Sequence, residues 1–258
     1  MLCITGSVLL SCNNADKKAT EVAKNSDWNG QNLKGRVQTM EETTYTPDST
    51  GKIGAMDSCC INIQQFDDKG YNTGSQSKDS KGTVKEESSF AHYEGGQAKE
   101  IINTKGGKPS GSFKITINKE GKYNGATAMD SVGKISSYYT NLTEDDYGAV
   151  TAGTEHKPDS SIKGYFINEY NKAMLVNSTG KDSSGKVTFM YKAELDNKGN
   201  VAKQTETNIT KDSTTTKVSS FKYDSFDEQG NWTQRTKYND KGKAVQVTKR
   251  SYTYFKKD

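Results

Sequence analysis

The sequence predicts an all-β protein in which antiparallel β-hairpins repeat along one long meander sheet. Three observations support this: a glycine turn that recurs along the chain, aromatic residues that alternate with polar ones between turns, and no sustained 3.6-residue apolar period. Hydrophobic residues make up only 31% of the 258 residues, which suits a sheet with one apolar and one wetted face. We expect a twisted or curled sheet that stays open or forms a half-barrel.

The chain begins with a short apolar run, Ile4 to Leu10, that is followed by Ser11 and Cys12. A small residue before Cys, preceded by leucine, resembles the lipobox of bacterial lipoproteins. The resemblance implies that residues 1–11 are a signal peptide, that Cys12 carries lipid, and that the protein is exported and anchored to the outer membrane. No Lys or Arg precedes the run, so we expect an incomplete signal. The alternative interpretation is a buried strand ending in Cys.

Residues 12–34 are polar and lack periodicity, and we interpret them as a tether. Trp28 is expected to be the first residue that docks onto the body of the protein. Residues 35–258 then form the hairpin-repeat domain.

Two kinds of glycine turn divide this domain into strands. In both, Asp or Asn can accept a hydrogen bond from the backbone two residues on, and Gly can take the left-handed conformation that closes a bulged hairpin. The first kind begins at Asp48, Asp79, Asn103, Asp130, Asp159, Asp182, Asp212 and Asn239. The second kind lies between them and ends at Gly70, Gly121, Gly199 and Gly230.

The segments between turns have room for six to ten residues, the usual length of a strand. Several carry alternating large residues, which place their rings on one face of the sheet. Examples are Phe90 with His92, Phe113 with Ile115, Phe189 with Tyr191, Phe221 with Tyr223, and Tyr252 with Tyr254.

The C-terminal part carries the segments Tyr223–Trp232, Lys237–Lys243 and Tyr252–Tyr254, which combine this turn with aromatic strands. They resemble YD (RHS-like) repeats and repeat-bearing lipoproteins of the Bacteroidetes type. The resemblance is best over residues 221–255 and fades toward residue 36. In large RHS proteins such repeats wrap into a shell around a cargo. For this chain, the resemblance implies a β-hairpin array at the cell envelope and no catalytic residue.

Two cysteines remain after Cys3 and Cys12, and they form the adjacent pair Cys59 and Cys60. Adjacent residues of a strand point to opposite faces, so a bond between them needs a distorted backbone. A vicinal disulfide and two reduced, partly buried thiols both stay open. No second Cys or His cluster is present to complete a metal site, and we expect no metal and no cofactor.

The charge pattern argues against a nucleic-acid partner. The 36 Lys and Arg nearly cancel the 32 Asp and Glu, which leaves a net charge of +4. Arginine, the residue best suited to bidentate phosphate recognition, occurs only at Arg36, Arg235 and Arg250.

No catalytic arrangement is predicted. His92 and His156 are the only histidines, and neither has a carboxylate or Cys at a diagnostic spacing. The paired acids of the turns, such as Asp67 with Asp68, lack the alternating ligands of a calcium loop.

We therefore expect a non-enzymatic binding module that contacts a glycan, a polymer or a protein through a broad sheet surface, as well as the membrane through its lipid. Trp232, Tyr71 and Tyr123 follow turn residues and are the candidate binding aromatics; the alternative is that they cover the apolar face of the sheet. The alternative function is a carrier that cradles a lipid or lipoprotein on the apolar face of a curled sheet. An envelope hydrolase is a third hypothesis, testable at the two histidines.

Overall fold

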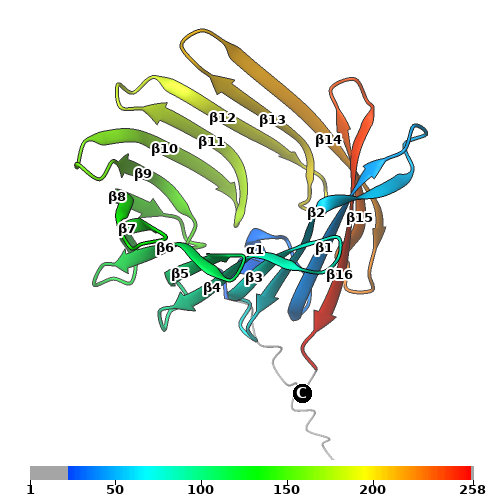
Figure 1. The fold of residues 1–258 in the computed structure, drawn as a ribbon, viewed down its shortest axis with the longest axis horizontal. Coiled ribbons are helices and arrows are strands. Elements are labelled where there is room, and N and C mark those ends of the chain that lie inside the picture. The colour runs from blue at the N-terminus through cyan, green and yellow to red at the C-terminus, as the bar shows by residue number, and fades with distance from the viewer. Residues whose placement is uncertain (1–22, 257–258) are drawn as a thin grey trace, which may run out of the picture.

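The structure, a computed structural model, describes residues 23–256, except the side chains of residues 58–60. One short helix, α1 (Asp27–Gly30), precedes sixteen strands (Figure 1). The strands are β1 (Val37–Pro47), β2 (Ile53–Phe66), β3 (Asn72–Asp79), β4 (Val84–His92), β5 (Ala98–Lys105), β6 (Lys108–Ile117), β7 (Tyr123–Asp130), β8 (Ile135–Glu144), β9 (Val150–His156), β10 (Ile162–Asn171), β11 (Met174–Asp182), β12 (Val187–Leu195), β13 (Val201–Ile209), β14 (Thr214–Phe226), β15 (Trp232–Asn239) and β16 (Ala244–Tyr254).

The sheet is a closed barrel, so the expectation of an open or half-barrel meander was wrong. Each strand pairs antiparallel with its neighbours in the chain, and the first strand pairs with the last in register from Val37 opposite Tyr254 to Tyr45 opposite Val247. The physical reason is that an open sheet leaves two edge strands with unpaired backbone groups, and closure removes both edges. The all-β composition and the repeated antiparallel hairpins are as predicted.

The hairpin turns that begin with Asp or Asn have the predicted chemistry. The turns expected to begin at Asn103, Asp159 and Asp212 are placed differently: Asn103 lies within β5, and the turns near the other two begin at Lys157 and Thr210. After β2, the N–H of Gly70 donates to the carbonyl of Asp67 at 3.1 Å, and Gly70 has a φ of +91°. The Asp67 carboxylate also accepts the N–H groups of Lys69 and Tyr71 at 3.0 and 2.9 Å. The same double acceptance by the first side chain occurs in the turns that begin at Asp48, Asp79, Asn118, Asp130, Asp145, Asp182, Asp196, Asp227 and Asn239.

Residues 23–36 lie across one end of the barrel, and we call this segment the plug. In Figure 1, α1 lies inside the outline of the strands. The side chain of Asn25 donates to the carbonyl of Gly95 in the β4–β5 turn at 3.0 Å, and α1 contacts β11. Asn32 and Lys34 reach the β12–β13 and β14–β15 turns. The plug therefore connects turns from around the rim.

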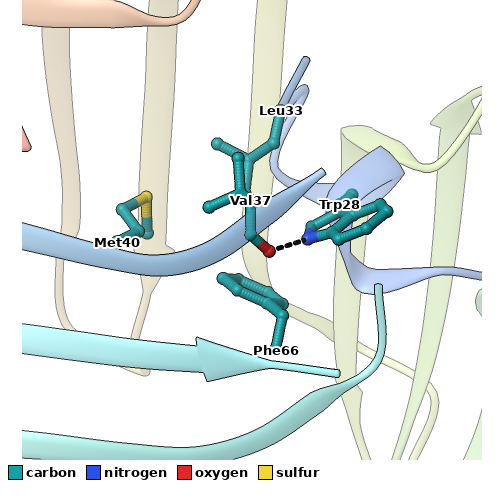
Figure 2. Close-up of a cluster of buried hydrophobic side chains, with 5 residues drawn as sticks. All are labelled: Trp28, Leu33, Val37, Met40 and Phe66. Atoms are coloured by element: carbon teal, nitrogen blue, oxygen red, sulfur yellow. Dashed lines mark hydrogen bonds between the residues drawn. The ribbon is translucent and has the colours of Figure 1, made fainter. Parts of the chain in front are cut away.

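The largest buried cluster lies where the plug meets β1 and β2 (Figure 2). Trp28 is 2% exposed, and its indole N–H donates to the carbonyl of Val37 at 2.9 Å. The cluster is completed by Leu33, Met40 and Phe66. Trp28 belongs to the plug, which lies inside the barrel. The faces of β1 and β2 that carry Val37, Met40 and Phe66 therefore line the interior of the barrel, which we call the lumen.

Among residues 23–256, no helix has the length and apolar character that a membrane-spanning helix requires.

We expect the substitution Gly70→Ala to destabilise the protein more than Gly242→Ala. Both glycines have a positive φ, which costs about 1–2 kcal/mol for an L-residue. A Cβ at Gly70 would also lie 2.5 Å from the ring of Trp28, whereas a Cβ at Gly242 meets nothing within 4 Å. Urea unfolding of the two variants measures the difference. Equal losses would show that the plug is not packed against this turn.

Candidate functional site

The aromatic side chains gather on the lumen face of the barrel. Residues directly opposite each other in an antiparallel ladder share a face of the sheet. The pairing partners therefore show, strand by strand from β1 to β16, which residues face the lumen. One such row runs from Phe90 through Ile101 to Phe113, and another links Phe166 and Phe189 through Gly180. The aromatic residues on the lumen face include Phe66, Phe90, Phe113, Tyr139, Phe166, Phe189, Tyr191, Phe221, Tyr223, Tyr252 and Tyr254.

One pocket in the lumen, which we call the apolar cavity, has a volume of about 340 Å³ and lies between β6 and β10. The rings of Phe113 and Tyr139 lie 5.5 Å apart in its wall. Gly153 makes room for the ring of Phe166 in this wall, because a Cβ there would lie 2.5 Å from that ring. The apolar cavity is lined by Phe113, Ile115, Tyr123, Ala126, Tyr139, Leu142, Gly148, Val150 and Phe166.

A second lumen pocket, the plug cavity, lies where the plug meets the β4–β9 side of the barrel and also measures about 340 Å³. It shares Tyr123 and Gly148 with the apolar cavity, so the two are neighbours. The Tyr123 hydroxyl accepts the N–H of Ala98 at 2.9 Å, and burial raises the pKa of this hydroxyl to about 12. Other lining residues are Asn25, Ser26, Asp27, His92 and Tyr147.

Asp27 places a carboxylate in the wall of the plug cavity. One of its oxygens accepts the backbone N–H of Asn72 at 2.6 Å. Burial raises the pKa of the Asp27 carboxyl above its ordinary value, and the N–H of Asn72 and the nearby His92 counteract only part of that effect. The carboxylate therefore has a stabilising hydrogen bond but an unfavourable environment for its charge.

The outer face of the barrel carries mostly polar and charged side chains, with exposed apolar ones such as Ile102, Ile167 and Met190 among them. Its strands carry the ion pairs Lys114–Glu100, Lys203–Glu194 and Lys222–Asp224, with N–O distances of 3.6, 3.6 and 3.1 Å. Register places these side chains opposite to the lumen set. A barrel embedded in lipid presents an apolar band outward, and a Lys at the bilayer midplane costs about 2–4 kcal/mol. The outer face is therefore suited to water.

The three predicted binding aromatics all belong to the lumen or its rim, but they do not come together. Trp232 is 6% exposed, and the guanidinium carbon of Arg250 lies 3.9 Å from its ring centroid. Tyr71 is 8% exposed and donates its hydroxyl to Asn25 at 3.1 Å. Tyr123 lines both cavities. Their role in binding stays a prediction.

The two histidines lie on opposite faces of the sheet. His92 lines the plug cavity, with its ring centroid 5.5 Å from that of Tyr71. His156 faces outward and stacks on Tyr138 with a centroid distance of 4.8 Å. The histidines therefore do not converge on one site.

Cys12 lies outside the described residues, as do the side chains of Cys59 and Cys60. Lipid attachment and the state of the cysteine pair stay predictions. In the part of the chain that the structure describes, no group of three or more His, Cys, Asp or Glu side chains is placed to hold a metal ion.

Sequence reasoning missed the plug and the residues that it contributes. Asn25, Ser26 and Asp27 lie within the range that we interpreted as a tether. The hairpin turn at residues 145–149 was expected from its paired acids, Asp145 and Asp146, but was not placed in either series of glycine turns, although Asp145 and Gly148 have the same spacing.

Comparison with known proteins gives a structural likeness only. No family matches the chain, and no curated protein matches it. A solved porin-like protein from Bacteroides uniformis superposes with a TM-score of 0.55 and 12% identity, covering 84% of this chain and 96% of that one. A porin-like protein from Bacteroides vulgatus gives a TM-score of 0.30 at 12% identity, with coverages of 85% and 100%. The TcdB2-TccC3 structure without its hypervariable region gives 0.32 at 11% identity, with coverages of 83% and 12%.

The first of these likenesses shows the fold alone, and the other two superpose too poorly to support an argument. The chain thus shares a closed β-barrel fold with the protein from Bacteroides uniformis. The resemblance to YD repeats stays a prediction.

We expect Asp27→Asn to raise stability at pH 7. Because burial raises the folded-state pKa of Asp27, its contribution to stability is present below the unfolded pKa and is lost as the pH rises through the folded pKa. Asparagine removes the charge and still accepts the N–H of Asn72. Thermal unfolding from pH 3 to pH 8 should show a higher melting temperature for the variant, and this difference should become smaller as the pH falls. A variant less stable at every pH would contradict a strained carboxylate.

Proposed function

We propose that this chain is an envelope β-barrel protein that binds, without catalysis, the hydrocarbon part of an amphiphilic ligand in its lumen. The observation that supports this is the apolar cavity, whose rings line the inside of a barrel with a charged outer face. The proposal follows the carrier hypothesis but moves the ligand from a curled sheet to the interior of a closed barrel.

The size and lining of the apolar cavity suit such a ligand. Its volume of about 340 Å³ falls at the lower end of the range typical of small-molecule sites. Transfer of apolar surface from water yields roughly 25 cal/mol per Å², so burying about 200 Å² of hydrocarbon gives roughly 5 kcal/mol before the costs of association. Before those costs, roughly 5 kcal/mol corresponds to a Kd of about 0.2 mM, so the apolar cavity alone is a weak binding site.

The envelope location is part of the proposal. It is supported by the likeness of the fold to the porin-like protein from Bacteroides uniformis and by the lipobox-like residues before Cys12. The charged outer face favours attachment through lipid on Cys12 over insertion of the barrel in the bilayer.

Contact with a glycan is the second candidate function. A groove of about 510 Å³ on the β9–β11 side includes Tyr165 and Lys181, which share the outer face. Tyr165 offers a ring for stacking, and the polar residues around it offer hydrogen bonds.

We expect Phe166→Ser to weaken binding of 1-dodecanol by ten-fold or more, because it removes a ring from the apolar cavity. Ile167→Ser is the matched control: Ile167 is the next residue, faces outward and is 46% exposed. Displacement of a fluorescent hydrophobic probe from the protein measures both affinities. Equal effects of the two substitutions, or no displacement from the native protein, would rule out the lumen as the binding site.

We expect Cys12→Ala to move the protein from the membrane fraction to the aqueous fraction. Without lipid, the polar outer face gives the barrel no surface that favours the bilayer. Detergent phase separation, with mass spectrometry of the N-terminal peptide of the native protein, measures this. A Cys12→Ala protein that stays in the detergent phase would contradict the anchor.

A further inference from the structure

The plug cavity contains buried polar groups that the proposed hydrocarbon site does not use. Ser26 lines it and is 2% exposed, and its hydroxyl has no hydrogen-bond partner among the described residues. A buried hydroxyl without a partner costs about 1–3 kcal/mol. Beside it, Asp27 keeps a carboxylate in a partly buried position with one hydrogen bond from Asn72. Both groups have capacity left for a ligand.

The electrostatic surroundings of the plug cavity are acidic. Its described lining residues include no Lys or Arg, and His92, whose charge lowers the pKa of Asp27, is the one basic side chain among them. The carboxylates of Asp67 and Glu144 act on the neighbouring groups: Asp67 raises the pKa of Asp27, and Glu144 raises that of Tyr123. Glu144 also accepts the N–H of Tyr123 at 3.1 Å. A positively charged group would compensate for this accumulation of negative charge.

Aromatic rings complete the wall. Phe90, Tyr123 and Tyr147 line the same cavity. Ring faces attract organic cations, and the attraction reaches about 2 kcal/mol or more when water is excluded. Carboxylate, hydroxyl and rings together form the set of groups that recognises an organic ammonium ion.

We propose that the plug cavity binds the ammonium group of an amphiphile whose hydrocarbon part occupies the neighbouring apolar cavity. The two cavities meet at Tyr123 and Gly148, so one molecule can extend from one into the other. The ammonium N–H groups donate to the Asp27 carboxylate and to the Ser26 hydroxyl oxygen. This inference rests on the proposed function, because it assumes that the apolar cavity takes the hydrocarbon.

The geometry also assigns a role to the plug. Asp27 and Ser26 belong to the plug, whereas Phe90, Tyr123 and Tyr147 belong to the barrel wall or its turns. A ligand in this position contacts both parts. Its binding therefore holds the plug in the barrel.

The experiment compares three probes on the full chain at pH 8: 1-dodecylamine, 1-dodecanol and ethylamine. An alkylamine is protonated at this pH, with a pKa near the lysine value of about 10.4. We expect dodecylamine to bind at least ten-fold more tightly than dodecanol, and ethylamine to bind weakly. Isothermal titration calorimetry measures the affinities below the concentrations at which the probes form micelles.

Asp27→Asn should reduce the ratio of dodecylamine to dodecanol affinity to near one while leaving dodecanol binding unchanged. Asp68→Asn is the matched control, because it removes the same charge from an exposed position of the β2–β3 turn. This control should keep the ten-fold ratio. Circular dichroism and thermal unfolding verify that both variants are folded.

The outcomes separate this inference from the proposed function. Equal binding of dodecylamine and dodecanol to the native protein, or an unchanged ratio in Asp27→Asn, would overturn the ammonium site and leave the hydrocarbon site standing. Failure of both long-chain probes to bind would overturn the proposed function. Ethylamine binding as tightly as dodecylamine would overturn the linked amphiphile and assign the plug cavity to small free amines.

Discussion

The pairing of β1 with β16 is the constraint on which the rest of the structure depends. Every other pairing joins strands that follow each other in the chain, and such a meander could end in two open edges. Closure instead gives every strand two partners and divides the side chains into an inner and an outer set. Closure gives rings such as Phe113 and Phe166 a shared lumen, and it turns ion pairs such as Lys114–Glu100 to the outer face. A sheet of sixteen strands is also wide enough to leave space inside after its side chains are placed.

The plug turns this wide barrel into one with defined cavities. Trp28 anchors it against β1 and β2, and Asn231 binds it at the far side through two hydrogen bonds with the backbone of Lys34, at 2.7 and 2.8 Å. Between these points the chain carries Ser26 and Asp27 past the wall. The buried carboxylate is costly for folding, and polar groups that are retained at a cost to stability are commonly found at functional sites.

The sequence was sufficient for the local structure. The four-residue turn from Asp67 to Gly70 specifies a bulged hairpin, because the first side chain accepts two N–H groups and the glycine takes a positive φ. Alternating rings such as Phe221 and Tyr223 specify a shared face. Closure was not predictable, because it pairs Val37 with Tyr254 and has no local signal. The docking of Trp28 was expected, but the rest of the plug was missed. The contacts of Asn25, Asn32 and Lys34 are single polar groups on distant turns, which leave no periodic pattern in residues 23–36.

Closure has a consequence for the order in which the protein matures. Hairpins between neighbouring strands can form as soon as both strands exist, because little chain entropy is lost in joining them. The last step brings β1 and β16, the two ends of the barrel sequence, together. The contact of Lys34 in the plug with Asn231 likewise joins residues that are 197 positions apart. The chain therefore cannot seal the barrel until its final strand is available for pairing. Until then it exposes aromatic rings and two strand edges, and this unsealed state is the one most open to aggregation.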